Sequence, residues 1–232
     1  YSNSLPARED AAGAPREKGI GPALRRRAKG LGESLLERWR AIADSARAVL
    51  GAGPATMGFV ILLLAVVDTA AKTLDELAID ILARQQPVAR DLRIVVSALR
   101  ISASLERMGD IAGHIAQLAR YRFPDKVVPK TLRPTFRELG RLDTEIAQRL
   151  VALLTTQDVS IAEEIRDLDD EVDALHLSVF DKVLGETWKG AAVDTVDATL
   201  ASRYHERFAD HAVSIAKKVQ YLSTGEWVPA EA

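Results

Sequence analysis

The sequence contains no cysteine, few aromatic residues and no excess of either charge. Without cysteine the chain can form neither a disulfide nor a thiolate metal site, and it has no cysteine nucleophile. We therefore expect a cytoplasmic protein. Aromatic residues make up 5% of the 232 positions, and alanine and leucine are abundant, which favours helices over sheets. The formal net charge of −2 argues against nucleic-acid binding.

Long hydrophobic runs are also missing. The most apolar run, from Phe59 to Val67, has nine residues. A helix that spans a bilayer needs about 20. We expect this run to be a segment of buried helix rather than a membrane anchor.

A repeat is the strongest pattern in the sequence. Glu106-Arg107-Met108-Gly109-Asp110 recurs as Glu206-Arg207-Phe208-Ala209-Asp210, and 7 of the 16 positions from 106 to 121 are identical in this register. Such self-similarity indicates two copies of one structural unit. On a helix, Glu and Asp four residues apart share a face and repel by about 0.2–0.5 kcal/mol. A fold that holds two such pairs is expected to offset the repulsion with positive charge.

Apolar periodicity and its breaks predict six helices in two sets of three. Residues 1–21 lack an apolar period, so we expect them to be disordered or loosely attached. The first unit, 22–125, should hold helices over about 22–50, 55–84 and 89–122; the second, 126–227, over about 135–155, 158–188 and 191–223. Asp158 is placed to cap the fifth helix, and Gly225 follows the sixth. The fold prediction is all-α: two antiparallel three-helix bundles in a pseudo-twofold arrangement.

The third and sixth helices have separate apolar and polar faces. One apolar stripe contains Leu105, Met108, Ile111, Ile115 and Leu118, and its counterpart contains Phe208, Ile215 and Val219. The acidic residues of the repeat lie off these stripes. They are expected to line a polar face of the bundle and to stay out of the core.

A third acidic pair, Asp169 and Asp173, lies on the fifth helix. If the fifth and sixth helices are neighbours, this pair faces Glu206 and Asp210. Four carboxylates from facing helices suit divalent or trivalent cations. The corresponding site in the first half consists of Asp68, Glu106 and Asp110; it is incomplete, because Leu64 stands four residues before Asp68.

The same acids have a metal-free interpretation as a solvated face. Arg203 and Arg207, or Arg100 and Arg107, are close enough in sequence to pair with them. His176 and His211 are candidate nitrogen ligands, with His114 and His205 weaker ones. No phosphate-binding glycine loop, GxSxG or HExxH motif occurs.

Several motifs in order resemble those of the PhoU family of phosphate-uptake regulators. They are Leu82-Ala83-Arg84-Gln85-Gln86-Pro87 with the following Arg90-Asp91-Leu92-Arg93, the two Glu-Arg-x-x-Asp segments, Asp169-Asp170-Glu171-Val172-Asp173, and Tyr221-Leu222-Ser223-Thr224-Gly225-Glu226. The resemblance covers about residues 68–226, and the first 66 residues are atypical. It implies two three-helix bundles whose acidic pairs hold multinuclear iron or zinc clusters.

The resemblance also implies a function without catalysis. PhoU-like proteins are negative regulators that connect a phosphate ABC transporter to a membrane sensor histidine kinase; they are cytoplasmic, peripheral to the inner membrane and often homodimeric. Two alternatives remain. A ferritin-like di-metal oxidase would require Glu-x-x-His pairs, whereas Glu106 and Glu206 have no histidine three residues later. The second alternative is a metal-free helical interaction module.

Overall fold

The computed structural model describes Arg26 and residues 54–226; for residues 54–67 and Ala70 only the backbone is described. Five helices make up this part of the chain: α2 (Pro54–Gln85), α3 (Arg90–Arg122), α4 (Arg133–Thr156), α5 (Ser160–Leu184) and α6 (Ala192–Thr224). No strand occurs in it, so the all-α prediction is confirmed. Apart from Arg26, the predicted helix over 22–50 lies outside the described residues, as does the disorder predicted for 1–21.

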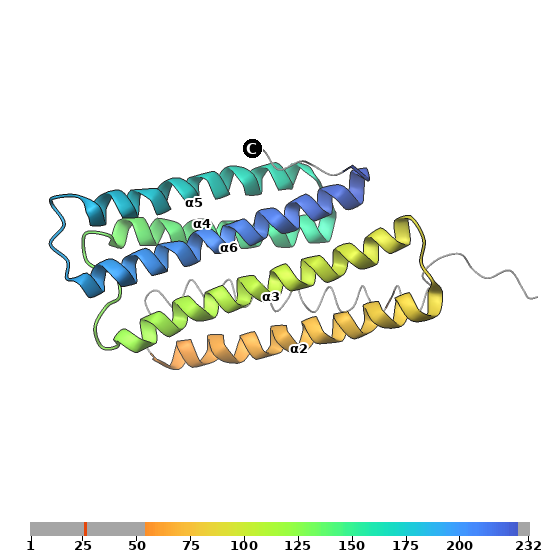
Figure 1. Ribbon diagram of the computed structural model, residues 1–232, viewed down its shortest axis with the longest axis horizontal. Helices are drawn as coiled ribbons and strands as arrows, with labels where there is room; N and C mark the ends of the chain where they lie inside the picture. The colour runs from red at the N-terminus through yellow and green to blue at the C-terminus, as the bar shows by residue number, and fades with distance from the viewer. Residues whose placement is uncertain (1–25, 27–53, 227–232) are drawn as a thin grey trace, which may run out of the picture.

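The helices run along one long axis (Figure 1). The second bundle is complete, with α4, α5 and α6 packed on one another. From the first bundle, α2 packs on α3, and α3 joins the two halves by packing along α6. None of the helices over residues 54–226 is long and apolar enough to cross a membrane.

The predicted helix bounds agree with the structure to within two residues, except at the end of α5. This helix was expected to reach Trp188 but ends at Leu184, because Gly185 is extended (φ −72°, ψ 152°). The N-cap of α5 is Val159, without a side-chain cap, so the prediction that Asp158 caps this helix is wrong; the Asp158 carboxylate, one residue earlier, accepts the Ser160 N–H at 3.0 Å. Gly225 closes α6 in the left-handed conformation (φ 78°) that favours glycine.

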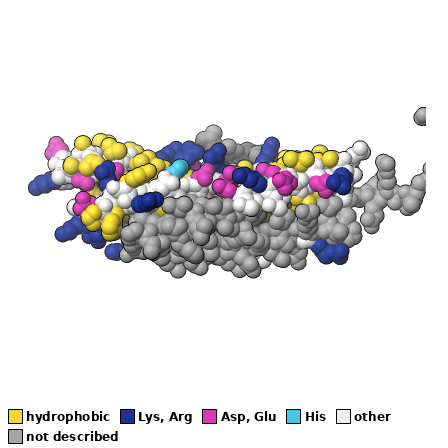
Figure 2. Space-filling view, turned by 90° about the horizontal axis from the view of Figure 1, so that it is seen from below, with side chains coloured by type: hydrophobic (Ala, Val, Ile, Leu, Met, Phe, Trp, Pro, Cys, Tyr) yellow, Lys and Arg dark blue, Asp and Glu magenta, His cyan; other side chains and the backbone are white. Residues whose placement is uncertain are grey.

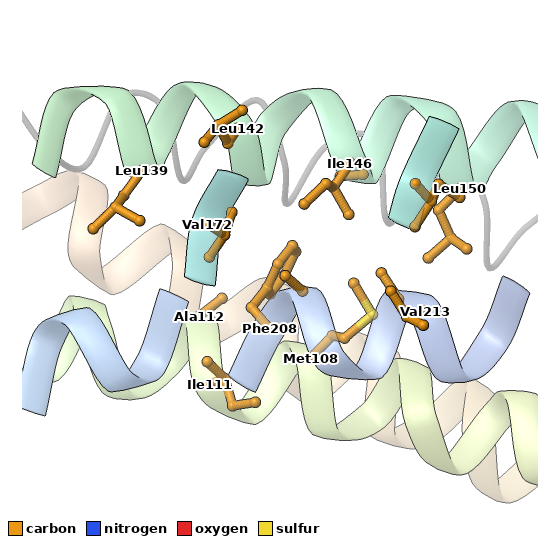
Figure 3. Close-up of a cluster of buried hydrophobic side chains, with 14 of the residues drawn as sticks. Met108, Ile111, Ala112, Leu139, Leu142, Ile146, Leu150, Val172, Phe208 and Val213 are labelled. Atoms are coloured by element: carbon orange, nitrogen blue, oxygen red, sulfur yellow. The ribbon is translucent and has the colours of Figure 1, made fainter. Parts of the chain in front are cut away.

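The core lies where α4 faces α3 and α6 (Figure 3). Leu139, Leu142, Ile146 and Leu150 of α4 point toward Met108 of α3 and Phe208 and Val213 of α6. The two predicted stripes are confirmed: Leu105, Met108, Ile111, Phe208, Ile215 and Val219 are buried, and Ile115 and Leu118 pack against them. Each large side chain buried here stabilises the fold by roughly 1.5–3 kcal/mol.

The repeated segments of α3 and α6 lie antiparallel in a regular register. Arg93 is stacked over Tyr221, with 5.9 Å between its guanidinium carbon and the ring centre. Further along α3, His114 lies 5.4 Å from Tyr204. At the end of α3, Arg122 pairs with Asp197. The two acidic segments are therefore near the middle of the molecule.

Candidate metal centre

The four acids predicted on α5 and α6 do face one another. These helices are joined by a short loop and run antiparallel (Figure 1). Burial raises the pKa of Asp169 to about 7, with further contributions from the charges of Asp173 and Asp210. Burial also raises the pKa of Asp173, and the charge of Asp210 adds to it. Asp210 of α6 thus acts on both α5 acids, as the predicted cluster requires.

Glu206 completes this group, which we call the α5–α6 acidic cluster: Asp169, Asp173, Glu206 and Asp210. Its pKa is raised, first by burial and then by the charge of Asp210. Two oxygens of the cluster, Asp169 Oδ1 and Glu206 Oε2, are buried without a hydrogen-bond partner. Buried carboxylate oxygens that lack a donor are costly unless protonated or paired with a cation.

The expectation that all these acids stay out of the core is wrong for Glu206, which is 9% exposed. The reason is local packing. Glu206 lies on the side of α6 that meets α5, and Arg203, one turn earlier, donates a hydrogen bond from Nη1 to Glu206 Oε1. An arginine pairing of the kind expected without metal therefore occurs. Asp173 and Asp210 are exposed and Asp169 is half-buried.

His176 is buried on α5, and the charge of Asp173 in the cluster acts on it. Its Nδ1 lies 3.0 Å from Ser202 Oγ, and that hydroxyl donates to Thr199 O at 3.0 Å. Because the hydroxyl has one proton to give, His176 Nδ1–H must be the donor of the other bond. Burial lowers the pKa of His176, which favours the neutral ring. Its Nε2 lone pair is then available, one helical turn from Asp173.

The remaining histidines have other environments. Burial, followed by the charge of Arg207, lowers the pKa of the half-buried His211. The ring of His114 packs on Tyr204. His205 is buried and bonded to Asp143.

The first-half acids are arranged differently. Glu106 and Asp68 are half-buried, and Asp110 accepts a hydrogen bond from Arg107 Nη1 at 3.1 Å. No hydrogen bond among the residues with described side chains links Asp68 to Glu106 or Asp110, and the Leu64 side chain lies outside the description. Figure 2 shows the molecule from below Figure 1; acidic and basic side chains are interspersed along that face.

The side chains are not arranged as a finished metal site in either half. Within residues 54–226, no group of three or more Asp, Glu or His side chains stands where it could hold a metal ion. The donor chemistry of the α5–α6 acidic cluster nevertheless suits a hard cation, since its ligands are carboxylate oxygens. Its two buried oxygens without a hydrogen-bond partner could be compensated either by a proton or by a cation.

One buried polar pair was missed by the sequence analysis. His205 Nδ1 lies 2.6 Å from Asp143 Oδ2, and His205 is 3% exposed. Burial raises the pKa of Asp143, and His205 opposes that rise. The signal was present: Asp143 stands four residues after the core residue Leu139, on the side of α4 that meets α6.

Comparison with known proteins identifies the family. The family model described as PhoU domain matches residues 40–119 and 136–219. The chain belongs to the PhoU family. The match covers both halves and begins 28 residues before Asp68, so the family likeness extends into the segment that the motifs left atypical.

Three relatives illustrate the extent of the likeness. The phosphate-specific transport system accessory protein PhoU homolog 1 of Mycobacterium leprae is 40% identical over 153 residues, which are 66% of this chain and 69% of the relative. The crystal structure of PhoU from Pseudomonas aeruginosa superposes with a TM-score of 0.78 at 23% identity, covering 88% of this chain and 99% of that one. The phosphate transport system regulatory protein PhoU from Streptococcus pneumoniae superposes with a TM-score of 0.75 at 20% identity, covering 89% and 100%.

Proposed function

We propose that this protein is an accessory regulator of phosphate uptake that represses phosphate-starvation signalling. In this role it links a phosphate ABC transporter to a sensor histidine kinase at the cytoplasmic face of the membrane, as a homodimer and without catalysis. The observation that carries the proposal is the PhoU match in both halves of the chain. The relatives' names support it, since they describe accessory or regulatory proteins of phosphate transport systems.

The proposal includes a metal bound by the α5–α6 acidic cluster. Asp169, Asp173, Glu206 and Asp210 would hold iron or zinc, with His176 as a candidate nitrogen ligand. A bound cation would neutralise carboxylates that now raise one another's pKa. The Arg203 guanidinium occupies Glu206 Oε1, so a cation would either use the other oxygen, Oε2, or displace Arg203 from Oε1. Asp68, Glu106 and Asp110 are proposed as the weaker site of the first half.

The metal part is tested by metal content. The protein is purified without a metal-affinity tag beside Glu206→Gln/Asp210→Asn, and metal per chain is measured by mass spectrometry. A matched control, Asp181→Asn/Glu186→Gln, removes the same charge from two exposed acids, one in the last turn of α5 and one just after the helix. We expect at least one equivalent of iron or zinc in the parent and the control, and a large loss in the cluster variant. Equal metal in all three proteins, or none in the parent, would refute the metal site and favour a metal-free interaction module.

The regulatory part needs a separate measurement. In the source bacterium, deletion of the gene should raise expression of phosphate-starvation genes in phosphate-rich medium, and the intact gene should restore repression. A deletion strain with unchanged expression would contradict the regulatory role, whatever the metal content. Capture of the transporter and the kinase on the purified protein, with each partner tested alone, then separates the two proposed contacts.

A further inference from the structure

A second candidate site lies at the end of the second bundle where α3 leads into α4 and α5 into α6. The two loops lie at the left of Figure 1. Together with Lys182 of α5 and Asp194 of α6, residues of these loops line a cavity of about 430 Å³. That volume is in the range of small-molecule pockets, about 300–1,000 Å³. The lining residue Lys182 is nine residues beyond Asp173 on α5, roughly 14 Å along the helix. The cavity is thus separate from the α5–α6 acidic cluster.

Three lysines line this cavity: Lys130, Lys182 and Lys189. None of them forms an ion pair with an acid among residues 68–226 for which side chains are described. Lys182 is held in place by a hydrogen bond from Nζ to Thr135 Oγ1 at 2.8 Å. One acid, Asp194, also lines the cavity; its carboxylate accepts the Ala191 N–H at 2.9 Å and keeps its negative charge. Three lysines against one aspartate leave the lining of the cavity with a net positive charge.

The start of α4 adds to this positive potential. Leu132 is the N-cap of α4 and lines the cavity. It provides no side-chain cap, and the first turn contains no acid. The helix dipole at such an end attracts anions, although Pro134 in the first turn has no N–H group and the Phe136 N–H is bonded to Leu132 O. At this cavity the helix end adds to the positive potential of the three lysines.

Trp188 gives the cavity an apolar wall. Its Nε1 donates to Thr195 Oγ1 at 2.8 Å, and its ring packs against the core, so the ring is fixed. Gly190 is needed for this position, because a Cβ there would come within 2.3 Å of the Trp188 ring. A fixed indole beside cationic groups is suited to a ligand with a flat ring and a charged tail.

We propose that this cavity binds a nucleoside phosphate, with the phosphates against Lys130, Lys182 and Lys189 and the base against Trp188. The site does not depend on the regulatory function proposed above. Two of the lysines are exposed side chains without described partners, Lys130 and Lys189, so their charge can be removed without disturbing the core.

The test is calorimetric titration of the full chain with ATP in EDTA, so that no metal at the acidic cluster can contribute. The pocket variant is Lys130→Gln/Lys189→Gln. The control, Lys72→Gln/Lys126→Gln, removes the same charge from exposed positions outside the cavity. We expect saturable binding of one ATP per chain, unchanged in the control and weaker by at least about tenfold in the pocket variant. Absence of saturable ATP binding, or equal weakening in both variants, would overturn the site.

Two further ligands test the two halves of the assignment. Adenosine should bind much more weakly than ATP, because it lacks the phosphates that meet the lysines. Tripolyphosphate should also bind more weakly, because it has no base for Trp188. If tripolyphosphate binds as tightly as ATP, the assignment to a nucleoside phosphate is wrong. If adenosine binds as tightly as ATP, the role of the lysines is refuted.

Discussion

Arg122, the last residue of α3, donates two hydrogen bonds to the carboxylate of Asp197 near the start of α6, from Nε at 2.5 Å and from Nη2 at 3.0 Å. The two residues are 75 positions apart and belong to the two repeated halves. Asp197 is buried, whereas Arg122 is half-buried. A bidentate pair of this kind fixes geometry as well as adding energy. It therefore anchors one end of the interface between α3 and α6.

Replacing the arginine should destabilise this interface. Arg122→Met leaves the buried Asp197 carboxylate without its two donors, and an unsatisfied buried charge is costly. We expect the midpoint of thermal unfolding to fall by a few degrees. Arg141→Met is the control, because Arg141 pairs with Glu138 and Glu145 on the exposed face of α4, where ion pairs contribute little. Equal losses in both variants would show that the Arg122–Asp197 pair is no more important than a surface pair.

The buried Asp143–His205 pair should show strong coupling. Asp143→Leu and His205→Phe each remove one partner and leave the other buried, so each should cost about 2–3 kcal/mol of unfolding free energy in urea titrations. The double variant Asp143→Leu/His205→Phe should cost less than the sum of the single changes, because no polar group is left unpaired. Additive losses would mean that the two side chains act independently despite their 2.6 Å separation.

The acidic cluster predicts an unusual pH dependence for the metal-free protein. The folded-state pKa of Asp169 is about 7, and the unfolded value is near 3.9. The folded state therefore keeps a proton that the unfolded state releases, and stability from this group is lost as pH rises from about 4 to 7. Asp173 and Glu206 are shifted in the same direction.

Unfolding in urea with EDTA at pH 5 and pH 8 measures this effect. Relative to Asp169→Asn, the parent should lose about 1–2 kcal/mol more between the two pH values, less than the whole shift because water reaches the site. The control Asp167→Asn changes an exposed acid nearby on the same helix and should keep the parent's pH dependence. A parent and an Asp169→Asn variant with parallel pH profiles would contradict the mutual repulsion of the cluster.

Much of the fold could be predicted, because the spacing of apolar residues and the residues at helix ends depend only on neighbours within one helix. Met108 and Phe208 were assigned to buried stripes by their three- and four-residue spacing, and both are buried. The end of α6 at Gly225 was found from local chemistry, whereas α5 starts two residues after Asp158, with Val159 as its N-cap. The end of α5 was missed because Gly185 was overlooked inside a polar stretch that otherwise continues the helical pattern.

The candidate site was predictable in composition but not in detail. Their spacing in the sequence places Asp169 and Asp173 on one face of α5, and Glu206 and Asp210 on one face of α6. The four acids were therefore expected to lie close together if α5 and α6 are neighbours. The sequence did not reveal that Glu206 is buried, because burial depends on how α6 meets α5. Asp143 and His205 were missed for the same reason: they are 62 residues apart, and only tertiary packing joins them.

Arg203 links stability to metal binding at this site. Its guanidinium is bonded to Glu206 Oε1, so it competes with any cation for that carboxylate. Arg203→Met should lower the stability of the metal-free protein by about 1 kcal/mol, since Arg203 is partly exposed and its attraction is screened. The same change should increase the stabilisation gained on adding zinc, because zinc then binds more tightly and ligand-induced stabilisation grows with affinity.

The control for this experiment is Arg207→Met, which removes the same charge from an exposed neighbour on α6. Arg207 lowers the pKa of Glu206 less than Arg203 does and forms no hydrogen bond to it among the described side chains. Arg207→Met should therefore change the stability of the metal-free protein, and the stabilisation gained on adding zinc, less than Arg203→Met does. Thermal unfolding of the three proteins, in EDTA and in micromolar zinc, gives both values. If Arg203→Met lowers stability equally with and without zinc, the guanidinium and the metal do not compete, and the cation proposed for the α5–α6 acidic cluster must bind without Glu206 Oε1.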